Sequence, residues 1–203
     1  MANTGKRAGT EARRKQILEA AIEVMGQKNY YWATTREIAD KAGVSERTVF
    51  VYFKNKKEIY REAVRQATQD MLEAVRHAAP PEADIRAFLK MSERNFLAFL
   101  DEHPLKVKLL FQCLDSMGDK ELNEDFREIF QSIYELFYLI VERAKQRGEI
   151  DEDVSTLSAV SCIVGFHFVV TYVEFLKLDW FEREQDIYSV VDVFADFVTG
   201  RGK

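Results

Sequence analysis

Apolar residues recur every three or four positions along most of the chain, which is the spacing of one buried face on an α-helix. Only three prolines and nine glycines interrupt the 203 residues, so long helices are favoured. No alternating run predicts a strand. The fold class predicted by this pattern is all-α. The expected helices cover about residues 10–26, 34–42, 46–53, 56–79, 83–102, 104–117, 121–147, 154–178 and 184–199.

Residues 34–58, TTREIADKAGVSERTVFVYFKNKKE, have the layout of a helix-turn-helix. Thr34 and Glu37 have the spacing of a capping box, which satisfies the free backbone donors at a helix start. Gly43 supplies the conformational freedom that a tight turn needs, and Ser45 can cap a second short helix. These signals predict two short helices joined by a glycine turn.

The second helix of a helix-turn-helix enters the major groove of DNA, so its exposed side chains should be donors or small. Arg47 is the best candidate for a base contact, because a guanidinium can bridge guanine O6 and N7. Val49 and Phe53 are expected on the buried side. The other residues expected to touch base edges, thymine methyl groups or phosphates are Thr34, Thr35, Arg36, Ser45, Thr48, Tyr52 and Lys56. An ordinary helical hairpin with a solvated basic face is the alternative, and the ordered combination of caps, alanines and glycine disfavours it.

The charge distribution separates the N-terminal third from the rest of the chain. Residues 1–66 hold 14 Lys and Arg against 8 Asp and Glu, a net charge of +6, whereas the remaining residues carry −11. A basic head on an acidic body is consistent with nucleic-acid binding by the head and a separate role for the body.

Residues 34–58 resemble the DNA-binding signature of the tetracycline-repressor (TetR) family of bacterial transcriptional regulators, and the chain length and all-α remainder fit the same family. The resemblance implies a helix-turn-helix DNA-binding domain over residues 1–55 and a helical effector-binding and dimerisation domain over residues 56–203. Phe50 stands where the family often has a tyrosine that bonds a phosphate, and phenylalanine lacks that hydroxyl. By resemblance, DNA contacts fall on Thr35, Arg36, Ser45, Arg47, Thr48, Tyr52 and Lys56.

The resemblance also implies a homodimer joined by its last two helices. Both expected helices carry a full apolar stripe, and two adjacent stripes could build a four-helix interface. Such stripes are more often simply core. The expected interface residues are Val164, Phe168, Tyr172, Val191, Phe194 and Val198.

A small-molecule pocket in each C-terminal domain is the third implication of the resemblance. The middle of the chain is rich in aromatic residues, which commonly line apolar ligand sites, although each one alone is more often core. The expected pocket residues are Asn95, Phe96, Phe99, Phe111, Phe130, Tyr134, Phe137, Phe166, His167 and Val170. The expected effector is a hydrophobic or aromatic small molecule, with an acyl chain among the candidates.

Enzymatic motifs are absent from the sequence: it has no phosphate-binding glycine loop, His-Glu-x-x-His, Cys-x-x-Cys or nucleophile-base pairing. We therefore expect no catalysis, no metal and no cofactor. Cys113 and Cys162 are expected to be small buried residues in a reducing cytoplasm. Residues 162–178 are apolar but fall short of a membrane span and carry charged groups, so a helix buried by protein is expected there.

The function expected from the sequence is a ligand-responsive transcriptional repressor in the cytoplasm. It would bind a palindromic double-stranded DNA operator as a homodimer and be released by its effector. The alternative is a dimeric DNA-binding regulator whose C-terminal domain only dimerises and binds no effector.

Overall fold

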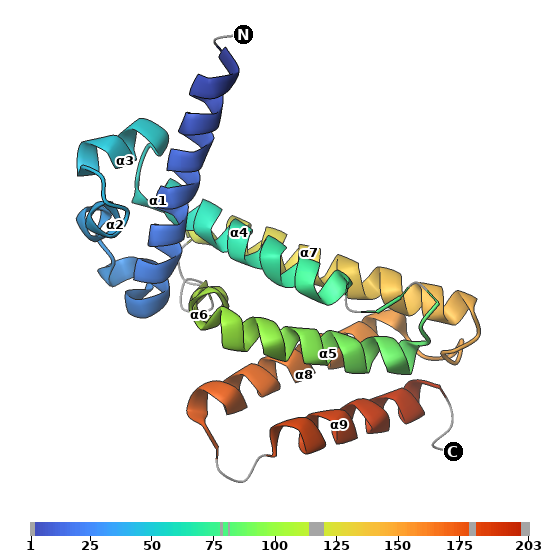
Figure 1. Ribbon diagram of the computed structural model, residues 1–203. Helices are drawn as coiled ribbons and strands as arrows, with labels where there is room; N and C mark the ends of the chain where they lie inside the picture. The colour runs from blue at the N-terminus through green and yellow to red at the C-terminus, as the bar shows by residue number, and fades with distance from the viewer. Residues whose placement is uncertain (1–2, 78, 81, 114–119, 179–181, 200–203) are drawn as a thin grey trace. The chain divides into compact units, whose positions relative to one another are not determined.

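The computed structural model describes residues 3–77, 79–80, 82–113, 120–178 and 182–199. This part of the chain is helical and contains no strand, which confirms the all-α fold class (Figure 1). The helices are α1 (Asn3–Trp32), α2 (Thr35–Lys41), α3 (Glu46–Tyr52), α4 (Lys56–Arg76), α5 (Ile85–Glu102), α6 (Pro104–Gln112), α7 (Lys120–Gln146), α8 (Thr156–Leu176) and α9 (Arg183–Val198).

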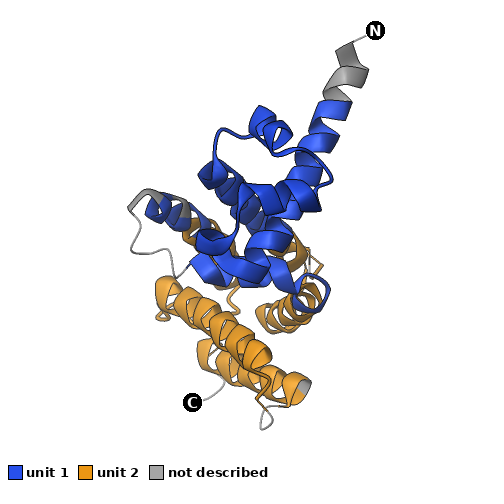
Figure 2. Ribbon diagram, turned by 90° about the vertical axis from the view of Figure 1, so that its left-hand side faces the viewer, with its two compact units in different colours: residues 1–70, 100–129 blue, residues 71–99, 130–203 orange. Residues whose placement is uncertain are grey.

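The chain forms two compact units (Figure 2). Unit 1 consists of residues 1–70 and 100–129, and unit 2 of residues 71–99 and 130–203. The helices α4, α5 and α7 therefore each contribute residues to both units. The domains expected over residues 1–55 and 56–203 remain a prediction.

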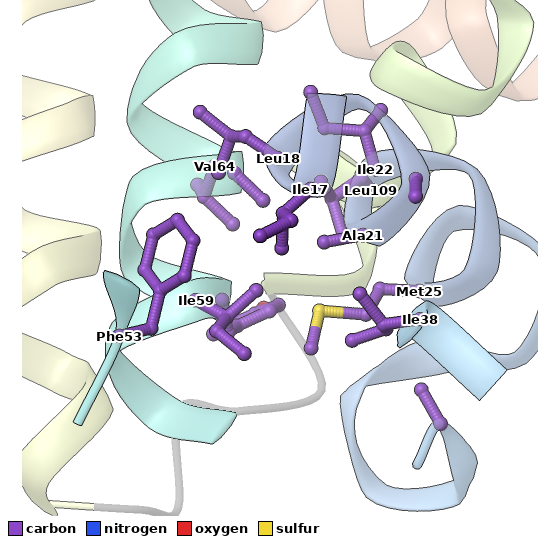
Figure 3. Packing of buried hydrophobic residues seen from close by; sticks show 14 of the residues in the cluster. Ile17, Leu18, Ala21, Ile22, Met25, Ile38, Phe53, Ile59, Val64 and Leu109 are labelled. Atoms are coloured by element: carbon purple, nitrogen blue, oxygen red, sulfur yellow. The ribbon is translucent and has the colours of Figure 1, made fainter. Parts of the chain in front are cut away.

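The core of unit 1 joins the helix-turn-helix to helices on both sides of it in the sequence. Side chains from α1, α2, α4 and α6 point toward one another (Figure 3). Complete burial of an aliphatic or phenyl side chain contributes roughly 1.5–3 kcal/mol, so this core holds the short helices α2 and α3 in place. Its fully buried members include Ile17, Ala21, Met25, Ile38, Val49, Phe53, Ile59, Ala63 and Leu109.

Helix α1 does not stop at Gly26, where the sequence predicted its end. A Cβ atom on Gly26 would lie 2.6 Å from the backbone oxygen of Leu105, so the glycine is needed for the close approach of α1 and α6. The irregular backbone comes at Asn29, with φ 65° and ψ 170°. The Asn29 side-chain oxygen accepts hydrogen bonds from the amides of Tyr31 and Trp32, at 3.0 Å and 3.4 Å.

The core of unit 2 is built from aromatic and branched residues of α4, α5, α7, α8 and α9. Its buried members include Leu72, Ile85, Phe96, Phe137, Val160, Ile163, Ile187 and Val191. The two cysteines behave differently. Cys113, in unit 1, is buried as expected, whereas the expectation is wrong for Cys162, which is exposed on α8.

Helix α8 is long and apolar enough to cross a membrane by length and composition alone, so the expectation that this segment falls short of a membrane span is wrong. Its residues Val160, Ile163 and Val170 are buried in the core of unit 2, as in a core helix of a globular unit. In the part of the chain that the structure describes, it is the one helix that passes this test, which is weak support for a membrane span.

Replacing Gly26 with alanine is expected to destabilise the protein by about 1–2 kcal/mol. The new methyl group meets a backbone oxygen of α6, so the two helices must separate, and this outweighs alanine's higher helix propensity. The free energy of unfolding from urea denaturation measures the effect. Gly9→Ala is the matched control, because nothing lies within 4 Å of the added atom. Equal stability of the two variants would contradict the close packing of α1 and α6.

Candidate nucleic-acid interface

The start of α2 is fixed by a reciprocal cap. The Glu37 amide donates to the Thr34 hydroxyl at 3.2 Å, and the Thr34 amide donates to the Glu37 carboxylate at 3.0 Å. Lys28 forms an ion pair with the same carboxylate. The hydrogen bond from Lys28, followed by that from the Thr34 backbone, lowers the pKa of Glu37. The cap predicted from the sequence is confirmed, and it presents Thr35 and Arg36 in the first turn of α2.

The turn after α2 is tight and has a positive φ at Gly43, as the sequence predicted. Gly43 has φ 63°, and its amide donates to the Asp40 carbonyl at 3.1 Å. The Val44 amide donates to the Ala39 carbonyl at 3.0 Å, which closes the end of α2. Ser45 then accepts a hydrogen bond from the Thr48 amide at 3.1 Å and caps α3 as predicted.

Helix α3 has one buried face and one exposed face. Val49 is buried, as is Phe53 just beyond the helix end, and both belong to the unit 1 core. On the opposite face Arg47 and Phe50 are exposed, and the Ser45 and Thr48 hydroxyls lie 2.8 Å apart. The structure thus brings a guanidinium, two hydroxyls and an aromatic ring onto one short helical surface. A surface of this kind can present donors to base edges in the major groove.

Two further exposed residues of α3 were missed in the sequence. Glu46 is exposed in the first turn of α3, and its carboxylate accepts a hydrogen bond from the Thr35 hydroxyl, which links the starts of α2 and α3. Val51 is 75% exposed, although it is apolar. A carboxylate can accept from cytosine N4, and an apolar side chain can contact a thymine methyl group. Helical spacing could have found Val51, since positions 47 and 51 lie opposite position 49, whereas position 46 lies on the side of positions 49 and 53 and carries no such signal.

Lys56 begins α4 and is tied to the connection between α1 and α2. Its ammonium donates to the Ala33 carbonyl at 2.9 Å and lies 4.6 Å from the centroid of the Tyr30 ring. Burial lowers the pKa of Lys56. The phosphate contact expected for this residue remains a prediction. Tyr52, expected to make a similar contact, is half-buried and packs against the unit 1 core.

The residues expected to line a pocket fall into both units. Phe111 belongs to unit 1, and the other nine belong to unit 2. Phe96, Phe99, Phe137 and Val170 are buried, whereas Asn95, Phe130, Tyr134, Phe166 and His167 are half-buried.

An aromatic group forms around the His167 ring. Its centroid lies 5.0 Å from that of Phe96 and 5.3 Å from that of Phe137. The Phe130 ring stacks with Tyr134 at 5.8 Å and with Phe168 at 5.9 Å. Asn95 donates to the Ala74 carbonyl at 3.0 Å. These contacts are within unit 2, and a ligand-binding role for them remains a prediction.

The residues expected at a dimer interface differ in exposure. Val164, Val191 and Val198 are buried in the core of unit 2, Phe168 and Phe194 are half-buried, and Tyr172 is exposed. Other apolar residues of the same two helices are exposed. They are Leu157, Val169, Phe175 and Leu176 on α8, and Val190, Val193 and Phe197 on α9. Both helices therefore have an exposed apolar face in addition to the face in the core.

Comparison with known proteins connects the chain to bacterial regulators. The family model described as bacterial regulatory proteins of the tetR family matches residues 17–63. The HTH-type transcriptional regulator YvkB of Bacillus subtilis (strain 168) is 33% identical over 146 residues, 59% of this chain and 77% of that protein. The fatty acid metabolism regulator protein of the same strain is 27% identical over 154 residues, 74% of this chain and 77% of that protein.

Solved structures share the fold. The crystal structure of the transcriptional regulator FadR from Bacillus subtilis in complex with stearoyl-CoA has a TM-score of 0.72 at 20% identity. The match covers 91% of this chain and 97% of that chain. The match includes residues of both units, so each unit shares the fold of that structure.

Arg47→Ala is expected to weaken binding to a cognate DNA site by about 1–3 kcal/mol, because a bidentate contact to guanine is lost. Fluorescence anisotropy with labelled DNA measures the loss. Arg76→Ala, which removes an exposed arginine from the last turn of α4, is the matched control and should leave affinity unchanged. Undiminished binding of the natural site by Arg47→Ala would rule out α3 as the reader of the groove.

Lys56→Ala should weaken binding to all DNA sequences by a similar factor, because a phosphate contact carries no sequence information. The slope of log affinity against log salt should fall by about one. The same titrations, repeated at several salt concentrations, measure it. An unchanged slope would assign Lys56 entirely to its contacts with Ala33 and Tyr30.

Proposed function

The chain belongs to the TetR family of bacterial transcriptional regulators, and we propose that it is a repressor released from DNA by an apolar effector. In this proposal it binds a palindromic operator as a homodimer in the cytoplasm. The observation that carries the proposal is the exposed face of α3, with Arg47 beside the Ser45 and Thr48 hydroxyls and Val49 buried behind them. We assign no catalytic role to the chain.

A dimer is needed because one short recognition helix covers only a few base pairs, too few for useful specificity. The exposed apolar faces of α8 and α9 support this part of the proposal. Val193 and Phe197 are 67% and 72% exposed, and they lie one helical turn apart on α9. Adjacent exposed apolar residues on a protein surface commonly mark an interface. We therefore propose that α8 and α9 pair with the same helices of a second copy.

An apolar effector is supported by the aromatic composition of the unit 2 interior. One relative, matched over 74% of this chain and 77% of its own length, is named a fatty acid metabolism regulator, and the FadR structure of the same fold contains stearoyl-CoA. A long acyl chain is also an effector class that a mainly apolar interior accommodates. We propose a long-chain acyl thioester as the effector class.

Release from DNA requires that the effector bind one state of the protein more tightly than the other. Helix α4 contributes residues up to Asp70 to unit 1 and residues from Met71 to unit 2, with no helix break between them. A rigid helix shared in this way can convey a displacement. Two recognition helices must match one turn of DNA, roughly 34 Å, so a displacement of a few ångströms should weaken binding.

The alternative is a regulator whose C-terminal region only dimerises. It is favoured by the burial of Phe96, Phe137 and Val170 in the protein's own core. Effector-independent DNA binding would distinguish this alternative from the repressor that we propose.

Val193→Glu and Phe197→Glu are each expected to produce monomers that no longer bind the operator. Each places a carboxylate where the proposed interface excludes water, which is disfavoured by several kcal/mol, whereas on an exposed surface it is nearly neutral. Light scattering after size exclusion measures the mass against 23.6 kDa for one chain. Ala98→Glu, at an exposed site on α5, is the matched control and should remain dimeric. A monomeric parent protein would refute the dimer.

Stearoyl-CoA is expected to raise the operator Kd at least about tenfold, equivalent to about 1.4 kcal/mol of differential binding. Anisotropy titrations of labelled operator with and without ligand measure the shift. Coenzyme A alone is the control and should have no effect, because it lacks the chain. Binding of stearoyl-CoA without any change in operator affinity would favour the dimerisation-only alternative.

A further inference from the structure

Glu93 is the one charged side chain that the structure buries among the residues it describes. It lies in the middle of α5 and is 1% exposed. The buried hydroxyls of Thr68, Ser92 and Thr171 each donate a hydrogen bond to a nearby backbone carbonyl. A carboxylate has no hydrogen to donate, so it cannot be satisfied in this way. Removing a carboxylate from water is disfavoured by several kcal/mol unless a partner compensates. A buried carboxyl in a mainly apolar core therefore requires an explanation.

His167 on α8 is the partner of one carboxyl oxygen. Its Nε2 lies 3.1 Å from Glu93 Oε1, and its Nδ1 lies 2.8 Å from the Ile163 carbonyl oxygen. A carbonyl oxygen can only accept, so Nδ1 carries a hydrogen and donates it. Nε2 lies close to Oε1 but completes no hydrogen bond with a described residue.

The other carboxyl oxygen, Oε2, is enclosed and receives no hydrogen bond from the described residues. Burial raises the pKa of Glu93. A buried acceptor without a donor destabilises a structure by roughly 1–3 kcal/mol, a penalty that a ligand could remove. The Phe96 and Phe137 rings that surround His167 make the rest of this environment apolar.

We propose that Glu93 Oε2 accepts a hydrogen bond from an O–H or N–H group of the effector, whose remaining surface is apolar. Small-molecule sites commonly have a mainly apolar lining in which a few fixed polar groups orient the ligand. The inference rests on the proposed function, since it places the effector in the interior of unit 2.

The chemistry of the pair also determines which headgroups are disfavoured. A carboxylate has no hydrogen to donate and would face the oxygen of another carboxyl group, so it leaves both acceptors unsatisfied. A hydroxyl on the chain supplies the missing donor. The amide N–H groups in the pantetheine arm of an acyl thioester supply the same chemistry, so either source fits.

Matched probes with a twelve-carbon chain test the inference by calorimetric titration of the full-length protein. The probes are 1-dodecanol, dodecyl methyl ether, dodecanoate and dodecanoyl-CoA. We expect 1-dodecanol to bind about tenfold more tightly than the ether, which has the same chain but ends in a methoxy group with no donor. Dodecanoate should bind no more tightly than the ether.

Two substitutions of Glu93 separate the effect of its acceptor oxygen on ligand affinity from the effect of its packing. Glu93→Met has a similar length and no acceptor oxygen, so the preference for alcohol over ether should fall to within about twofold. Glu93→Gln can donate its amide to His167 Nε2 and keep a carbonyl oxygen for the ligand, so the preference should persist. Arg94→Gln, at an exposed neighbour on α5, is the control. Loss of affinity for dodecanoyl-CoA in Glu93→Met would identify the amide N–H as a second source of the donor.

Equal binding of alcohol and ether by the native protein would overturn the inference, as would a preference that survives in Glu93→Met. The native comparison needs no variant, so the test stands even if Glu93→Met does not fold. If the probes bind and release operator DNA without any donor preference, this inference alone fails. If no probe binds, the proposed effector class and this inference fail together.

Discussion

The burial of Val49 and Phe53 determines which face of α3 is exposed. Both side chains lie in the unit 1 core with Ile38 and Ala39 of α2. An α-helix turns about 100° per residue, so a slip of one position would rotate Arg47 away from the exposed face. The proposed DNA-reading surface therefore depends on an apolar contact behind it. The caps at Thr34 and Ser45 and the Gly43 turn add directional restraints to that contact.

The helix-turn-helix was predictable because its signals are local in the sequence. A cap and the amide that it accepts are three residues apart, and a turn glycine needs only its own backbone conformation. The order of the remaining helices followed from apolar spacing, but the bounds of α1 did not, since it runs from Asn3 to Trp32 and was predicted over residues 10–26.

The features that could not be predicted depend on contacts between distant segments. In the sequence, Gly26 has the pattern of a helix end. Only its distance to the backbone of α6 shows that it permits close packing of α1 against α6. Helix α8 is apolar on every side, so spacing alone could not separate buried Val164 from exposed Val169 and Cys162. Glu93 was overlooked because charged residues are usually exposed. It nevertheless falls on the apolar stripe of α5 with Ile85, Leu89 and Phe96, and that position was the available signal.

The central claim is that two copies of the exposed α3 face read DNA together, and selection of binding sites from random double-stranded DNA tests it most directly. The account predicts enrichment of an inverted repeat whose half-sites are about one helical turn apart. Each half-site should contain a guanine that Arg47 contacts, and selection with the Arg47→Ala variant should no longer enrich that guanine. Enrichment of a single half-site would contradict the paired reading. A guanine that persists with Arg47→Ala, or no enrichment at all, would contradict the role of α3.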